Sequence, residues 1–202
     1  QIRKIMLRTN LRALATFVCL STTVHAQFEL GENSRINPDD FSITMFATDL
    51  NYPVAMVELE DKSILVAVSN GAAFFSSTSG QIIRLVDEND DGISDRQTVI
   101  EDQLPIGGPT ALKKVDDLLF LTGQGKPISI MKLGPEPNFK LTELGRININ
   151  DGKSWMHPNS ALVARRVGDL YEIYFPLGSK ANFVKTTQTR YLGTTFGLSA
   201  EL

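Results

Sequence analysis

Pro53-Val54-Ala55-Met56 begins a motif that returns as Pro109-Thr110-Ala111-Leu112 and again as Pro158-Asn159-Ser160-Ala161-Leu162. Each copy is followed by a turn and a second, more hydrophobic run. The three prolines stand 56 and 49 residues apart, which is close to the ~40–50 residues of a four-stranded propeller blade. The repeat therefore predicts small sheets whose apolar faces are covered by neighbouring sheets.

Short apolar runs along the chain indicate an all-β fold. The clearest lie at 64–68, 81–86, 118–121 and 128–131, and clusters of Gly, Pro, Asn and Asp separate them. Such spacing is typical of strands joined by turns, whereas no long stretch after residue 26 has a helical period. A sandwich and a propeller both fit this pattern, and the repeat favours the propeller.

The repeat also predicts the boundaries of the units. The first blade is expected from about Pro53 to Gln103, the second from about Gly107 to Asn150, and the third from near His157. Residues 41–48 alternate in polarity and are expected to form a strand that pairs with the final blade. Because a propeller needs roughly four to eight blades, residues 27–202 are expected to form about two and a half blades of a truncated ring.

A glycine follows the second apolar run of each unit, at Gly71, Gly123 and Gly178. Glycine adopts positive φ at little steric cost. We therefore expect a turn with positive φ at each of these positions.

The first 26 residues have the order of a secretory signal peptide. Four basic residues and no acid accompany the apolar run 13–20, and Val24-His25-Ala26 predicts cleavage before Gln27. The apolar run is shorter than the roughly 20 residues of a membrane-spanning helix, so no membrane span is expected. The domain 27–202 is therefore expected to be secreted or periplasmic. This domain would lack cysteine, because Cys19 is the only one in the chain. It would therefore have no disulfide and no cysteine metal site.

The charge of the expected mature chain limits its partners. Removing the leader leaves 16 basic and 23 acidic residues, a net charge of about −7. A chain of this sign has no electrostatic footprint for nucleic acid or for an anionic membrane. We therefore expect neither as a partner.

One loop has the spacing of calcium ligands. Oxygen side chains occupy its positions 1, 3, 5 and 9, glycine occupies position 6, and position 7 offers a backbone carbonyl; these ligands are Asp87, Asn89, Asp91, Asp95 and Ile93. Position 12 is Thr98 instead of the bidentate Glu of an EF-hand, and the flanking runs predict strands. The alternative interpretation is a polar hairpin turn without an ion, since Asp-Gly is a favoured turn pair.

A second group of residues surrounds the third copy of the motif. Trp155-Met156-His157-Pro158 precedes a predicted strand pair that ends in Leu177-Gly178-Ser179 and Asn182. Together with Phe41 to Pro53 and the Asp-rich hairpin, these residues resemble the soluble quinoprotein glucose/sorbosone dehydrogenases, which are six-bladed propellers. The resemblance covers most of residues 41–182.

The resemblance implies an activity and a cofactor. In that family a histidine at the start of a blade takes the proton of the sugar's anomeric hydroxyl, while hydride passes to pyrroloquinoline quinone (PQQ) above the central channel. His157 matches this histidine by position, and a neutral imidazole suits the task near pH 7. Many members have Gly-Asp where this chain has Gly178-Ser179, and the family's quinone and calcium ligands come mainly from later blades. The resemblance does not identify the sugar or the redox partner.

Three classes of function stay open from the sequence. The first is a sugar dehydrogenase that uses PQQ, and the second is a non-catalytic propeller that binds carbohydrate or protein, in which His157 is an ordinary loop residue. The third is a calcium-dependent hydrolase of the lactonase type. It would need carboxylates or amides at the start of each blade, where the residues near Pro53 and Pro109 offer only Asn51.

Overall fold

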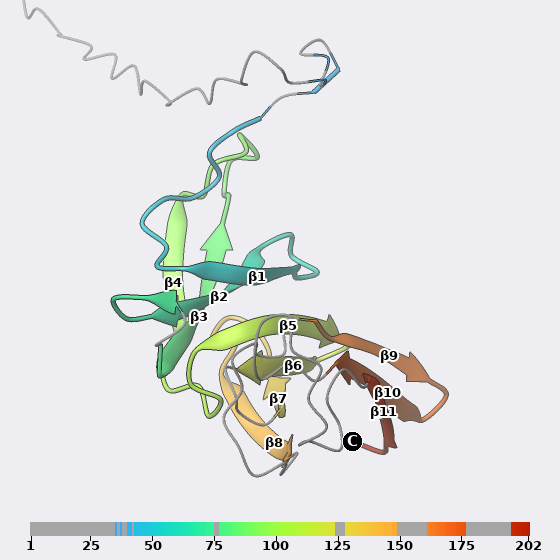
Figure 1. Cartoon of the computed structure of the whole chain (residues 1–202). Helices are drawn as coiled ribbons and strands as arrows, with labels where there is room; N and C mark the ends of the chain where they lie inside the picture. Colours follow the sequence, from blue (N-terminus) through green and yellow to red (C-terminus); the bar gives the residue numbers. More distant parts are fainter. Residues whose placement is uncertain are drawn as a thin grey trace, which may run out of the picture. The chain divides into compact units, whose positions relative to one another are not determined.

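Runs of β-branched and other apolar residues between turns form the strands of this protein, as their propensity favours. The computed structural model (Figure 1) describes residues 35, 37, 40, 41, 43–74, 77–123, 128–148, 161–176 and 195–202. Their strands form three sheets, in which neighbouring described strands are antiparallel. The all-β prediction is therefore confirmed.

The strands follow one another in simple meanders. The first sheet has the order β1-β2-β3-β4 and comprises β1 (Pro53–Glu58), β2 (Ile64–Asn70), β3 (Ser79–Val86) and β4 (Arg96–Glu101). The second has the order β5-β6-β7-β8 and comprises β5 (Pro109–Val115), β6 (Leu118–Gly123), β7 (Ile128–Leu133) and β8 (Leu141–Ile147). The third contains β9 (Val163–Val167), β10 (Leu170–Pro176) and β11 (Thr195–Ala200), with β10 in the middle.

The sequence repeat corresponds to a repeat of structure. Pro53 and Pro109 are each the first residue of a sheet, and in both sheets the register with the second strand shifts between this proline and the alanine two positions later. Proline has no N–H to donate and is tolerated at the first position of a strand. The two copies of the motif therefore start equivalent sheets, and the third copy, at Pro158, lies outside the described residues.

The second sheet has a packed core on both of its faces. Because side chains alternate across a strand, Leu119 and Leu121 of β6 join a buried cluster with the first sheet. Leu118 and Phe120 join a second cluster with the third sheet. β5 contacts β1 on one side and β9 on the other, so the first strands of consecutive sheets lie next to each other.

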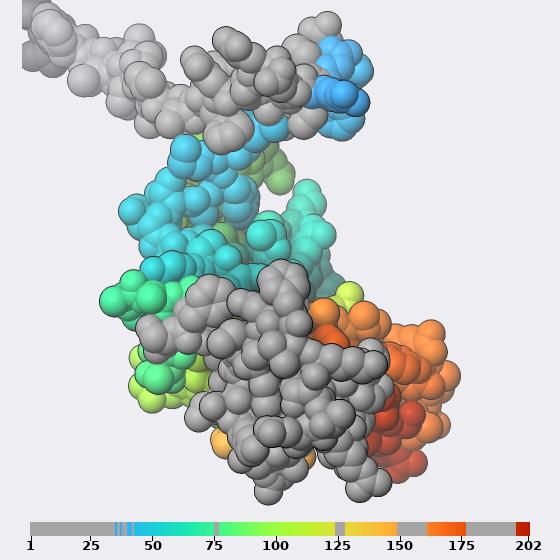
Figure 2. All heavy atoms as spheres, viewed as in Figure 1, coloured from blue at the N-terminus to red at the C-terminus, as the bar shows by residue number. Residues whose placement is uncertain are grey.

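The third sheet exposes the face that points away from the second. Tyr171, Ile173 and Phe175 of β10 are buried, whereas the alternate residue Tyr174 and the β9 residue Val163 are exposed. Residues of β9, in orange, are visible at the surface in Figure 2. The exposed face of this sheet is therefore mixed, because it also carries the ion pair of Arg165 and Glu172.

The strand expected over residues 41–48 is wrong for the residues described there, which have no strand assignment. From Thr44 onward the segment lies across the first sheet, where Phe46, Ala47 and Leu50 pack on its apolar face. The backbone carbonyl of Phe46 accepts a hydrogen bond from the Ser94 amide at 2.7 Å. The alternation of polarity does not follow burial, because Ile43 and Met45 are exposed whereas the neighbours Phe46 and Ala47 both pack on the sheet.

The glycines after the second strands differ in their roles. Gly71 has φ 128°, as expected. Gly123 is not among the residues with positive φ; it is the last residue of β6, where an added Cβ would overlap the backbone oxygen of Ile106. The expectation of positive φ is therefore wrong at Gly123, which is needed for close packing. Gly178 lies outside the described residues.

Candidate functional site

The predicted calcium ligands lie in the loop between β3 and β4. Asp87 organises this loop: its Oδ2 accepts a hydrogen bond from the Gly92 amide at 2.8 Å, and its Oδ1 accepts from the Asn89 and Asp91 amides at 3.3 and 3.2 Å. Asn89 Oδ1 also accepts from the Asp91 amide at 2.9 Å. Asp87, Asn89 and Asp91 are thus brought together inside one loop.

The remaining predicted ligands continue this pattern. The Ile93 amide donates to Asp91 Oδ1 at 2.9 Å, and the Glu88 amide donates to Asp95 Oδ2 at 2.7 Å. Gly92 has φ 81° and Asp90 has φ 57°, so the backbone turns sharply in the middle of the loop. The connection is longer than a two-residue hairpin turn, since β3 ends at Val86 and β4 begins at Arg96.

The charge of Asp87 follows from these contacts. Desolvation raises the pKa of its carboxyl group, but hydrogen bonds from the backbone amides of Gly92, Asp91, Asn89 and Asp90 together outweigh it and hold the pKa below its usual value. Asp87 is therefore ionised at neutral pH. Because a carboxylate has about four lone-pair positions, a cation would have to replace some of these amide hydrogen bonds.

The hydrogen bonds give the loop residues a structural role that needs no ion. Across the described ranges, no group of three or more His, Cys, Asp or Glu side chains is arranged to hold a metal. The oxygens of Asp87, Asn89 and Asp91 instead satisfy backbone amides of the turn. The donor set suits a hard cation by chemistry, and calcium binding by this loop stays a prediction.

His157, the predicted catalytic base, lies outside the described residues, as do Trp155, Met156 and Ser179. The equivalent end of the first two sheets is described at 51–53, 70–74 and 104–110. These residues include no Lys or Arg, the side chains best suited to bind the carboxylates of PQQ. These described residues therefore supply no cation for the carboxylates of a quinone.

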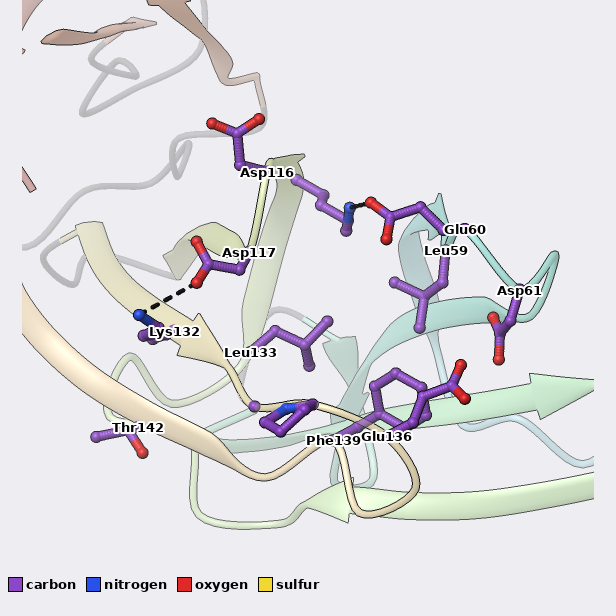
Figure 3. Close-up of a pocket in the computed structure, with 13 residues that line it drawn as sticks. Leu59, Glu60, Asp61, Asp116, Asp117, Lys132, Leu133, Glu136, Phe139 and Thr142 are labelled. Carbon is purple, nitrogen blue, oxygen red and sulfur yellow. Dashed lines mark hydrogen bonds and ion pairs between the residues drawn. The ribbon is translucent and has the colours of Figure 1, made fainter. Parts of the chain in front are cut away.

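A cavity of about 400 Å³ opens at the opposite end of the sheets (Figure 3). Its walls come from the β1–β2 turn, the β5–β6 turn and the β7–β8 loop. The charged residues among its lining are Glu60, Asp61, Asp116, Asp117, Glu136, Lys114 and Lys132, and the apolar ones include Leu59, Leu133, Pro135 and Phe139. Sequence reasoning missed this site.

Ion pairs order the rim of the cavity. Lys114 Nζ lies 3.2 Å from Glu60 Oε1, and Lys132 Nζ lies 3.2 Å from Asp117 Oδ2. The repeat contained a signal for these acids, because Glu60-Asp61 and Asp116-Asp117 both follow the first strand of a unit.

Asp61 is the most constrained carboxylate of the rim. Burial raises its pKa, but hydrogen bonds from the Ser63 hydroxyl and amide and from Arg84 together lower the pKa by more than burial raises it. The pKa of Asp61 is therefore below its usual value. The Arg84 guanidinium pairs with Asp61 and stacks over the Phe139 ring, 4.4 Å from its centroid. This stacking connects the charged rim to the apolar floor.

Comparisons with known proteins identify no relative: no protein-family model, no curated protein and no solved structure matches the chain. Within the part of the chain that the structure describes, no helix is both long and apolar enough to cross a membrane.

Proposed function

We propose that this chain forms the first sheets of a six-bladed β-propeller that oxidises a sugar, of the quinoprotein glucose/sorbosone dehydrogenase type. The observation that supports the propeller is the repeat of antiparallel sheets, two with four strands and one with three described strands, whose first strands adjoin, β1 beside β5 and β5 beside β9. A closed ring needs roughly four to eight sheets. The proposal therefore includes further sheets outside the described residues.

In this proposal His157 stands at the start of the third sheet and takes the hydroxyl proton of the sugar. A neutral imidazole has a pKa of about 6.5, which suits a base near neutral pH. PQQ would accept the hydride, and its binding site would lie outside the described residues.

The proposal places the protein outside the cytoplasm. Residues 1–26 would direct export and be cleaved before Gln27, which leaves a secreted or periplasmic domain over 27–202. The test of the activity is dye reduction by the full-length protein supplied with PQQ and Ca²⁺. We expect reduction that depends on both an aldose and the quinone, and its absence across a panel of aldoses would contradict the proposal.

A non-catalytic, carbohydrate-binding propeller is a second candidate. The part of the first sheet near Pro53 presents Asn51 and Tyr52, both exposed, and the Tyr52 ring lies 6.3 Å from that of Phe74. An amide beside aromatic rings can contact both the polar and the apolar face of a sugar. Aldose binding without quinone-dependent oxidation would favour this candidate.

A structural calcium ion in the Asp87 loop is part of the proposal. At 10 mM Ca²⁺ and a dissociation constant of about 1 mM, binding would stabilise the fold by about 1.4 kcal/mol, a rise in Tm on the order of 3–5 °C. We expect Asp87→Asn combined with Asp91→Asn to abolish this rise, because it removes two of the ligand charges. Thermal melts with and without Ca²⁺ provide the measurement.

A matched control changes the same loop at positions that are not predicted ligands. Glu88→Gln combined with Asp90→Asn removes the same charge and should keep the calcium-dependent rise. If both double variants keep it, the ion binds elsewhere. If the unmodified protein shows no rise, the loop is a turn without calcium.

A further inference from the structure

The cavity between the first and second sheets has an apolar floor and a charged rim. Figure 3 shows Leu59, Leu133 and Phe139 between carboxylates that come from different turns. Phe139 and both leucines are buried. A concave site of this size with an apolar lining and a few convergent polar groups is typical of a small-molecule site.

Among the described residues, the rim has one carboxylate without an ion pair. Five carboxylates and two ammonium groups line the cavity, and Arg84 and Arg166 pair with two of the carboxylates, Asp61 and Asp116. Lys114 and Lys132 are each held in an ion pair, and Asp61 is held by Arg84. Glu136 is exposed and forms no ion pair with another residue in the described part of the chain.

We propose that this cavity binds a small organic cation with an apolar body, whose ammonium group pairs with Glu136 while the apolar part covers Leu59, Leu133 and Phe139. The site lies at the opposite end of the sheets from the proposed sugar site and does not depend on it.

Charge and shape select this class of ligand over the alternatives. An anion would find no free lysine, because both lysines of the rim are already paired with carboxylates. A bare inorganic cation would use only the carboxylate, whereas an apolar body of a few carbon atoms would also cover the small apolar surface that the lining still exposes, at about 25 cal/mol per Å². Both parts of the site are therefore used only by an amphipathic cation.

The test uses two probes of nearly equal shape, 2-phenylethylammonium and the neutral 2-phenylethanol. Binding of each to the full chain is measured by ligand-observed NMR titration at pH 7 and low salt, because salt screens exposed charges. We expect saturable binding of the amine and at least about tenfold weaker binding of the alcohol, as a charge-assisted hydrogen bond to an ionised carboxylate would give.

Two variants test whether Glu136 causes the preference for the amine. Glu136→Gln should lower the affinity for the amine by about three- to tenfold and leave the affinity for the alcohol unchanged. The expected loss is modest because water screens an exposed ion pair. Glu201→Gln removes the same charge from an exposed residue outside the cavity and should change neither. No saturable amine binding, equal affinity for both probes, or equal weakening by the two variants would each overturn the proposal. Because Glu136 is exposed, we expect a circular dichroism spectrum unchanged by its substitution, and this keeps the comparison valid.

Discussion

Phe120→Ala is expected to lower the free energy of unfolding by about 3–5 kcal/mol, as large-to-small substitutions of buried aromatic residues do. Phe120 is 0% exposed and belongs to the cluster between the second and third sheets. Its ring lies 6.3 Å from that of Tyr171 on β10. The substitution would leave a cavity where neighbouring strands can collapse only partly. Equilibrium denaturation by urea measures the change.

Phe41→Ala is the matched control for this substitution. Phe41 is 63% exposed, and surface substitutions usually change stability by less than about 0.5 kcal/mol. Equal, small effects of the two substitutions would mean that the second and third sheets do not pack against each other as described.

His157→Gln is expected to reduce sugar oxidation by about 10²–10⁴-fold, the usual contribution of a general base. The expectation rests on the proposed function. Glutamine is similar in size but cannot take up the hydroxyl proton, so folding and quinone binding should change little. The measurements are dye-linked turnover, a thermal melt and a quinone titration on the full-length protein and its variant.

A structural role for His157 predicts the opposite pattern. Loss of one hydrogen bond of a loop histidine would cost about 1 kcal/mol of stability and leave turnover nearly unchanged. Preserved activity with a lowered Tm would therefore remove the only catalytic residue that the proposal assigns.

Local patterns in the sequence were sufficient to predict the strands and the residues at which the sheets begin. Pro53 and Pro109 mark equivalent positions because a residue without an N–H fits at the first position of a strand. The run 118–121 predicted β6 because four consecutive apolar residues suit a strand buried on both faces. The expected units 53–103 and 107–150 contain the first and second sheets as observed.

Features that depend on tertiary packing could not be predicted from local sequence patterns. The alternation over 41–48 predicted a strand, but Met45 is exposed and its neighbour Phe46 packs on a sheet instead. The cavity joins Glu60 and Glu136, which only the packing of two sheets brings to one site. In the Asp87 loop, an acid-rich turn and a calcium loop share the same spacing, so the sequence left both interpretations open.

The central claim is that consecutive sheets are arranged as blades around their first strands, and spin-label distances test it most directly. With Cys19→Ser, one pair of labels replaces Met56 of β1 and Lys113 of β5, and a second pair replaces Val99 of β4 and Leu144 of β8; all four residues are exposed. In a propeller the sheets diverge outward, so the distance between the β1 and β5 labels should be clearly shorter than that between the β4 and β8 labels. Two sheets stacked face to face, about 10 Å apart throughout, would give similar distances for both pairs, and that result would contradict the propeller.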